Sequence, residues 1–236
     1  MASRDPATSG RRRRGELTRE LMVRESLRLL DTEGLAGFSL PKLGRALGAD
    51  PTAVYRHFAS KDDLVLAIAD HLLEEAHAGM AVSDCWVAAL EESCRGLRAV
   101  YLEHPAAASL SACRTTQGPG EMRDVNYLIE AVLKAGFEGA EAAVVYRAIG
   151  DFSLFWSGSE AAFLALDERL QKNDRDAWTS AYMNADQAVY PAIYQIRHHL
   201  PEVQDQAIFD TVLSFLLDGL QARAPRPCTC PRHSPR

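Results

Sequence analysis

Apolar residues recur at helical spacing from near the start of the chain. Val23, Leu27 and Leu30 occupy positions i, i+4 and i+7, so they share one face of a helix that we expect over about 17–33. Gly34 follows at the position where a C-cap glycine is common. The pattern therefore predicts an amphipathic first helix with a buried stripe and a defined end.

A second, shorter apolar stripe follows within a few residues. Ser39 has the side chain of an N-cap, and Leu40, Leu43 and Leu47 repeat at the spacing of one helix face. Gly48 then interrupts the pattern. We therefore predict a short helix between Ser39 and Gly48.

Two capping signals mark the next two helices. Asp50 precedes Pro51, a residue favoured in the first turn, and the helix that they begin can extend only to about Phe58. Ser60 and Asp63 have the spacing of a capping box, although the acid is Asp rather than Glu. Short helices joined in this way by a tight turn are typical of a helix-turn-helix.

The pattern stays helical to about residue 222, without the alternation that is typical of strands. We expect helices near 84–103, 106–113, 121–135, 139–167, 176–184, 189–199 and 203–222. The sequence thus predicts an all-α fold, in which an N-terminal three-helix helix-turn-helix domain joins a larger helical bundle. The expected divisions are a disordered basic arm at 1–15, the helix-turn-helix domain at 16–62, the helical domain at 63–222 and a flexible tail at 223–236.

Charge is distributed unevenly over the 236 residues. The net charge of −6 argues by itself against nucleic acid, but residues 1–65 hold 12 Lys and Arg against 9 Asp and Glu, whereas the remainder holds 14 against 23. A basic N-terminal part on an acidic remainder is expected when one small domain contacts DNA phosphates. The alternative is that Arg11–Arg14 alone accounts for the excess of positive charge in residues 1–65. With 47% hydrophobic residues and no apolar run suited to a membrane span or a signal peptide, we expect a folded cytoplasmic protein.

The segment 52–58 carries the candidate chemistry. In a helix-turn-helix the second helix enters the major groove, and Val54 and Phe58, at i and i+4, are suited to pack inwards. The outward side chains then include hydroxyl, guanidinium and imidazole groups that suit phosphates and base edges, with further cations on the neighbouring helices. The predicted DNA contacts are Lys42, Arg45, Thr52, Ala53, Tyr55, Arg56, His57 and Lys61.

These residues also have ordinary structural interpretations. Tyr55 could pack between helices, and His57 could be a buried, hydrogen-bonded residue. Arg56 and Lys61 could be solvated surface charges. The basic arm Arg11–Arg14 could enter a minor groove or remain a solvated tail. The structural interpretations of Tyr55, Arg56, His57 and Lys61 would all have to hold together for the DNA hypothesis to fail.

The segment 23–68 resembles the N-terminal domain of the tetracycline repressor (TetR) family. The residues that carry the resemblance are Gly34, Phe38-Ser39, Leu43, Ala46-Leu47-Gly48, Pro51-Thr52-Ala53-Val54-Tyr55-Arg56-His57-Phe58 and Lys61-Asp62-Asp63-Leu64. The resemblance implies that Tyr55, His57 and Lys61 contact the DNA backbone or nearby bases, and that the other outward residues of this helix lie at the groove. Pro41 departs from the family pattern, in which a polar or basic residue is frequent, so the operator cannot be copied from a relative.

Beyond residue 80 the resemblance is one of helical layout, together with Tyr190-Pro191 and an acidic last helix. It implies a transcriptional regulator, most often a repressor, that binds a palindromic double-stranded operator as a homodimer and is released by a small hydrophobic ligand. It also implies that two C-terminal helices form a four-helix bundle with their mates, for which 139–167 and 203–222 are the candidates. The alternative is that the wide apolar stripes of these two helices are monomer core.

A ligand pocket of this kind needs an apolar cavity with a few polar groups. Mid-chain aromatic and polar residues are the candidates, although aromatics at helical spacing are also typical of plain core. The candidate ligand contacts are Trp86, Tyr101, His104, Arg123, Asn126, Tyr127, Phe152, Phe155 and Trp156.

The sequence predicts no metal, no cofactor and no catalytic residues. Cys228-Thr-Cys230 with His233 has residue types that bind metals, but the spacing differs from a zinc C-x-x-C and the segment is rich in Pro and Arg. We find no nucleophile–base pair or phosphate-binding loop. Two other functions stay open: a DNA-binding architectural protein with a filled C-terminal core, and an all-α enzyme with a cavity joining a histidine such as His104 to a carboxylate.

Overall fold

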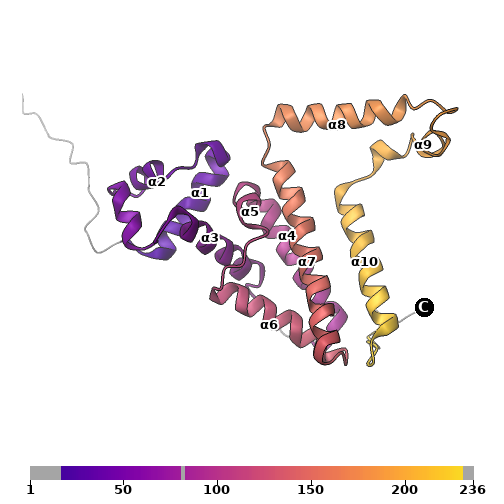
Figure 1. Ribbon diagram of the computed structural model, residues 1–236, viewed down its shortest axis with the longest axis horizontal. Coiled ribbons are helices and arrows are strands. Elements are labelled where there is room, and N and C mark those ends of the chain that lie inside the picture. Colours follow the sequence, from indigo (N-terminus) through magenta and orange to yellow (C-terminus); the bar gives the residue numbers. More distant parts are fainter. Residues whose placement is uncertain (1–16, 81–82, 231–236) are drawn as a thin grey trace, which may run out of the picture.

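The computed structural model describes residues 17–80 and 83–230, and every regular element within those ranges is a helix (Figure 1). The elements are α1 (Arg19–Gly37), α2 (Leu40–Ala46), the 3₁₀ helix η1 (Pro51–Arg56), α3 (Lys61–Ala76), α4 (Trp86–Glu103), α5 (Pro105–Ser111), α6 (Pro119–Lys134), α7 (Gly139–Leu164), α8 (Glu168–Met183), α9 (Pro191–Ile196), the 3₁₀ helix η2 (Leu200–Glu202) and α10 (Asp205–Arg223). The all-α prediction is confirmed. The arm expected at 1–15 lies outside the described residues.

The helix ends near the N-terminus follow the capping residues. The Thr18 hydroxyl accepts from the amide of Leu21 at 3.1 Å, and the Ser39 hydroxyl accepts from the amide of Lys42 at 3.4 Å. Gly34 has a φ of +64°, so the regular turns of α1 are interrupted at the glycine that the sequence pattern had marked. Local side-chain chemistry therefore sets where α1 and α2 begin and where the regular part of α1 ends.

Two apolar cores hold the molecule together. In the first core, Leu27 and Leu30 of α1 join Tyr101 of α4 and Ala107 of α5. The second core lies within the larger domain, where residues of α4, α6, α7 and α10 meet. Because the first core is shared, the N-terminal helices rest directly on the body of the protein, and α3 packs against both α1 and α4.

Arg98 determines much of the placement of α10. This side chain is buried on α4, and its guanidinium donates to both carboxylate oxygens of Glu160 on α7, at 2.7 and 2.8 Å. It also donates to Gln206 on α10 and lies 4.7 Å from the ring centre of Phe209. One buried cation therefore ties together three helices of the body.

Two boundaries in the second half differ from the sequence prediction. A helix was expected at 176–184, but α8 begins at Glu168, where Asp167 caps it by accepting from the amide of Arg169 at 3.0 Å. The helix expected at 189–199 is limited to α9, with η2 after it. None of the residues of α8 or α9 is buried, and α8 crosses the top of the view away from the first core (Figure 1).

The flexible tail predicted for 223–236 is wrong for its first residues. Ala224 and Cys228 are buried, and the amide of Arg226 donates to the carbonyl of Ala135 at 2.9 Å. Local composition does not record long-range main-chain contacts such as this one, so a segment rich in Pro and Arg is predicted to be flexible. Residues 231–236, including His233, lie outside the described part.

Helix length and hydropathy also bear on membranes. Across the described ranges, none of the helices combines the length and the apolar character that a bilayer crossing requires.

Candidate DNA-binding and ligand-binding sites

The turn between α2 and η1 depends on two glycines. A Cβ added to Gly44 would lie 2.9 Å from the Cα of Pro51, closer than real Cβ atoms approach backbone. Gly48 has a φ of +63°, a conformation that costs little only for glycine. These two positions let the start of η1 pack directly against α2, which produces the compact turn of a helix-turn-helix.

The segment η1 displays its polar side chains on a well-buried support. Val54 is 2% exposed and Phe58 is 1% exposed, whereas the side chain of Tyr55 is 56% exposed. The expected inward pair is therefore found. One detail differs from the prediction: the helix is 3₁₀ and ends at Arg56 rather than continuing to about Phe58, because His57 begins the turn toward α3.

Most of the predicted contacts on η1 face outwards. Tyr55 and Arg56 are exposed, and Ala53 and His57 are half-buried at the edge. Thr52 is exposed, and its hydroxyl donates to the carboxylate of Asp50 at 2.6 Å, the same group that accepts from the Thr52 amide at 2.8 Å. The capping contact thus sets the direction of the Thr52 side chain.

The flanking cations have partners that position them. Lys61 lies at the first turn of α3, with its ammonium 5.6 Å from the ring centre of Phe38. Lys42 on α2 pairs with Glu33 of α1, whereas Arg45 is exposed at the last turn of α2. Because the pairing partner of Lys42 is also exposed, DNA phosphate can compete for this ammonium.

The capping box predicted at Ser60 and Asp63 is formed only in part. The Ser60 hydroxyl accepts from the amide of Asp63 at 3.0 Å, and the Asp63 carboxylate accepts from the amide of Ala59 at 2.9 Å. The Asp63 side chain thus bonds the amide of the residue before the N-cap Ser60, whereas the acid of a capping box bonds the amide of the N-cap residue itself. This reciprocal pair fixes the chain direction between η1 and α3, and with it the position of Lys61.

Arg19 is a contributor that sequence reasoning missed. Its guanidinium lies 4.2 Å from the ring centre of Phe58 and donates to the carbonyl of His57. The same group approaches the Asp63 carboxylate at 3.5 Å. Arg19 and His57 are 38 residues apart, so no local sequence pattern could have predicted their contact. The contact joins α1 to the end of η1.

The candidate ligand residues that belong to the second core are Trp86, Tyr127, Phe152 and Trp156. Phe152 and Trp156 of α7 pack with Phe209 of α10, with ring centres 5.8–6.5 Å apart, and Tyr127 of α6 belongs to the same core. The Tyr127 hydroxyl and the Trp156 indole N–H are buried without a hydrogen-bond partner in the described parts of the chain, as is the Ser157 hydroxyl. Such groups are costly to bury unless something else binds them.

Other candidates do not belong to the ring cluster that Phe152, Trp156 and Phe209 form. Trp86 donates its indole N–H to the carbonyl of Arg226 at 3.0 Å, and Tyr101 belongs to the first core, where burial raises the pKa of its phenol. The His104 ring contacts the carboxylate of Asp31 on α1 at 2.9 Å.

Three more of these residues lie at the surface. Arg123 pairs with Glu74 of α3, Asn126 is exposed on α6, and the ring of Phe155 is 56% exposed on α7. The structure therefore separates Trp86, Tyr101, His104, Arg123, Asn126 and Phe155 from the ring cluster.

A largely buried histidine–carboxylate pair beside Tyr127 was not expected from the sequence. His77 Nε2 lies 3.1 Å from an oxygen of Asp124, and the rings of His77 and Tyr127 meet edge to face at 5.5 Å. Burial raises the pKa of the Asp124 carboxyl, an effect that the neighbouring His77 opposes. Polar residues at this depth are the kind of groups that orient a ligand.

Family models match almost all of this architecture. The family of bacterial regulatory proteins of the TetR type matches residues 23–68, and the tetracyclin repressor-like C-terminal domain matches residues 81–224. This chain belongs to the TetR family. The C-terminal domain of the tetracycline repressor type, for which the sequence resemblance was one of layout, is confirmed.

Similar proteins span nearly the same length. An HTH-type transcriptional regulator of Saccharopolyspora erythraea is 28% identical over 88% of this chain and 86% of its own. BioQ, solved with its natural double-stranded DNA operator, is 26% identical with a TM-score of 0.61, covering 88% of this chain and 99% of BioQ. ActR of Streptomyces coelicolor, solved with actinorhodin, shares the fold at 21% identity and a TM-score of 0.76, over 89% and 98% of the two chains.

Proposed function

We propose that this TetR-family protein is a homodimeric repressor that binds a palindromic operator through η1 and leaves it when a small apolar ligand fills the second core. The observation that carries the proposal is the outward display of Tyr55 and Arg56 above the buried pair Val54 and Phe58. The relatives are named as transcriptional regulators, and we assign no catalytic activity to this chain. The site of action is the cytoplasm, where chromosomal DNA is found.

The DNA contacts divide by chemistry. Thr52, Ala53 and Arg56 are assigned to base edges in the major groove, where a small side chain allows close approach and a guanidinium suits guanine. Tyr55, His57 and Lys61 are assigned to the phosphate backbone, which fixes orientation. Lys42 and Arg45 on α2 are assigned to phosphates beside the groove, because the first helix of the motif crosses the backbone.

The test begins with DNA selected from random fragments by the purified protein. Replacing Tyr55 and Lys61 together by Ala removes two exposed polar groups without touching the core, so operator affinity should fall at least about tenfold while circular dichroism is unchanged. Lys172→Ala on α8 is the matched control, since it removes an exposed cation far along the chain from η1. Unchanged affinity of the double variant would refute these assignments.

A homodimer is supported by apolar side chains left exposed on two helices. Phe215 of α10 is 71% exposed, and Phe155 and Val144 of α7 are also exposed, although these helices contribute other residues to the core. Large exposed apolar groups on otherwise packed helices indicate a surface that a partner covers. We assign α7 and α10 to a four-helix bundle with the same helices of a second copy, which places two η1 segments on one operator.

The ligand site is assigned to the ring cluster of α6, α7 and α10. Phe152, Trp156 and Phe209 supply flat apolar surface, and the hydroxyls of Tyr127 and Ser157 supply polar groups that have no partner within the described residues. This combination fits a planar aromatic compound that carries hydroxyl or carbonyl groups. Binding there can change DNA affinity only by favouring one arrangement of the C-terminal domains, and so of the two helix-turn-helix domains, over another.

Hydroxylated naphthoquinones and anthraquinones are suitable probes for this site. At least one compound from a panel of these quinones should raise the melting temperature of the wild-type protein and weaken its operator binding, because a ligand stabilises the state that it binds. Phe152→Ala combined with Trp156→Ala should abolish the shift, whereas Trp178→Ala on exposed α8 should keep it. If neither these quinones nor any other apolar compound changes the melting temperature, a ligand-independent architectural role becomes the better hypothesis.

A further inference from the structure

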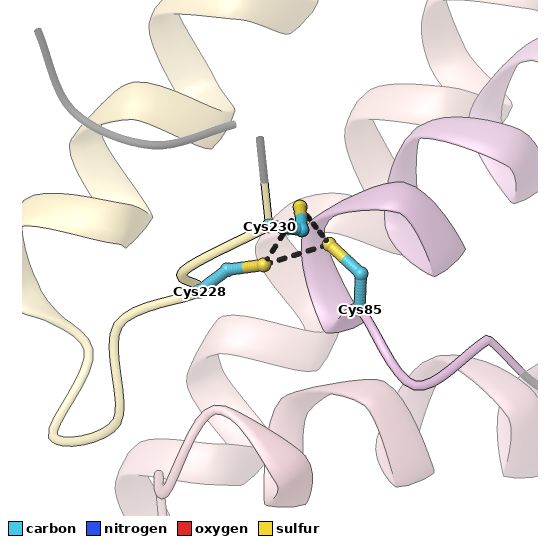
Figure 2. Close-up of side chains that lie close together, drawn as sticks. All are labelled: Cys85, Cys228 and Cys230. Carbon is cyan, nitrogen blue, oxygen red and sulfur yellow. Dashed lines mark hydrogen bonds between the residues drawn. The ribbon is translucent and has the colours of Figure 1, made fainter. Parts of the chain in front are cut away.

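Three cysteines from opposite ends of the C-terminal domain meet at one point. Cys85 is the residue that caps α4, whereas Cys228 and Cys230 follow α10, 143 and 145 positions further along the chain (Figure 2). The sulfur of Cys85 lies 2.7 Å from that of Cys228 and 2.8 Å from that of Cys230, and the last two are 3.0 Å apart. The three sulfur atoms therefore form a nearly equilateral triangle.

The surrounding structure fixes this meeting of thiols. The amide of Cys228 donates to the side chain of Gln221 at 3.1 Å, and the same side chain donates back to the Cys228 carbonyl at 2.7 Å. Two residues earlier, Arg226 is held through its amide by the carbonyl of Ala135 and through its carbonyl by Trp86. The segment is thus bound to α10 on one side and to α4 and α6 on the other.

A glycine makes room for the approach of this segment. Gly136 has a φ of +89°, and a Cβ at this position would lie 3.0 Å from the side chain of Pro225 and 3.3 Å from the amide of Arg226. A side chain there would be strained by its backbone conformation and crowded by the segment. The close contact that carries Cys228 to Cys85 is therefore built into the turn after α6.

We propose that Cys85, Cys228 and Cys230 bind one thiophilic metal cation, zinc, which fastens the segment after α10 to the start of α4. This site is separate from the proposed DNA and ligand sites, and the proposal does not depend on them. All three sulfur atoms lie within 4.8 Å of one another, close enough to share a single metal ion, and they come from two segments that are far apart in the sequence.

The triangular arrangement favours a shared cation over a disulfide. A disulfide joins two sulfur atoms at about 2.0 Å and leaves a third aside, whereas here the three separations are nearly equal. A point about 1.6 Å out of the plane of these sulfur atoms is about 2.3 Å from each of them, the usual zinc–thiolate distance. On binding, the sulfur atoms would spread toward the wider spacing of a tetrahedron.

The chemistry of binding involves no change of oxidation state. Each of the three thiols releases its proton to solvent, and the resulting thiolate donates an electron pair to the zinc ion. Three thiolates leave one corner of a tetrahedron for a further ligand, either water or another side chain.

The experiment uses the full chain, purified with reductant and freed of metal by a chelator. Zinc is titrated against a chromophoric chelator, and cobalt(II) is titrated separately, because thiolate ligation of cobalt gives a charge-transfer band in the near ultraviolet. We expect one cation per chain. We also expect the three clustered thiols to be protected from a thiol reagent once zinc is bound, with exposed Cys113 still reactive.

Variants identify the ligands. Cys85→Ser, Cys228→Ser and Cys230→Ser should each weaken zinc binding at least roughly 100-fold, because each removes one thiolate from the cation. Cys113→Ser is the matched control, since that thiol is exposed and outside the cluster, and it should bind zinc like the wild type. If a serine variant fails to fold, thiol protection in the wild-type chain still decides the outcome.

Three results would overturn the proposal. The first is the absence of zinc binding by the reduced wild-type chain, and the second is undiminished binding by the three serine variants. The third is binding of copper(I) in a parallel titration without any binding of zinc, which would overturn the identity of the cation. Mass spectrometry that finds two of the three thiols joined in the metal-free protein, together with no cation binding after reduction, would establish a redox pair instead.

Discussion

Arg114 and Asp62 form a two-pronged ion pair, in which each terminal nitrogen of the guanidinium donates to a different carboxylate oxygen at 2.8 Å. Asp62 lies in the first turn of α3, one residue after Lys61, and Arg114 follows α5. The pair therefore joins the segment that leaves η1 to the body of the protein. A single contact, between His104 Nδ1 and a carboxylate oxygen of Asp31 on α1, also joins the N-terminal helices to the body.

The Arg114–Asp62 pair should make a pH-dependent contribution to stability. Hydrogen bonding and charge from Arg114 lower the pKa of the Asp62 carboxyl below its ordinary value. The contribution is therefore fully present above the ordinary pKa of an aspartate, and it is lost as the pH falls through the lowered value. We expect Arg114→Ala to lower the urea midpoint at neutral pH, and the difference from wild type to shrink as the solution is acidified to about pH 3.

Lys172→Ala provides the comparison for this measurement, because Lys172 pairs with Asp176 within α8 and joins no two elements. Its effect on the urea midpoint should be smaller at every pH. A difference between Arg114→Ala and wild type that grows on acidification would contradict the role given to Asp62.

Lys61 should contribute a salt-dependent term to DNA binding. A lysine that contacts phosphate releases counterions, so Lys61→Ala should reduce the slope of log affinity against log salt concentration by about 1 and weaken binding to all sequences alike. Fluorescence anisotropy with the selected operator and with a scrambled duplex measures both quantities. Lys134→Ala on α6 is the control and should leave the slope unchanged. A loss confined to the operator would place Lys61 at a base instead.

Gly44 should tolerate no side chain. The Cβ of Gly44→Ala would meet the backbone of Pro51 at 2.9 Å, so α2 and η1 must separate, with a loss of about 1–3 kcal/mol in the free energy of unfolding. Gly150→Ala is a suitable contrast, because its Cβ would meet only Tyr146 and Leu128 at ordinary distances of 3.7 and 3.8 Å. That change should be neutral or stabilising by up to about 1 kcal/mol, since alanine favours the helix. Urea unfolding of the two variants distinguishes these outcomes.

Phe215 should be essential to the dimer. Replacing this exposed aromatic of α10 by Asp places a charge in the proposed four-helix bundle, so light scattering after size-exclusion chromatography should report a monomer at concentrations where wild type is dimeric. Met122→Glu on α6 changes an equally exposed apolar residue outside the bundle and should remain dimeric. A Phe215→Asp protein that stays dimeric would move the interface away from this face of α10.

The helix-turn-helix was predictable from the sequence because local chemistry specifies it. Ser39, Asp50 and Ser60 each cap the helix that follows, and each binds an amide only two or three residues further along the chain. The burial of Val54 and Phe58 was likewise predictable from their i and i+4 spacing alone. What the spacing could not supply was the 3₁₀ form of η1, which depends on where the chain must turn toward α3.

The C-terminal domain was less predictable for two physical reasons. The first half of α8 carries no apolar stripe, so the periodicity of the sequence predicted only the second half of this helix. The structure buries no residue of either half. The contacts of Arg226 and the meeting of Cys85 with Cys228 join residues more than 90 positions apart, so no local pattern records them. The ring cluster was found only in part, because helical spacing cannot tell which aromatic residues of α4 to α7 point to the same place.

The uninterrupted helix α3 has a mechanical consequence. Its 16 residues, from Lys61 to Ala76, form a rod about 24 Å long that has no proline and no glycine within it. A tilt of about 5° at the Ala76 end would swing Lys61 through about 2 Å, enough to pull a lysine out of hydrogen-bonding range of a phosphate. If Lys61 contacts a phosphate as proposed, a small tilt of α3 set by the body of the protein would be enough to break that contact.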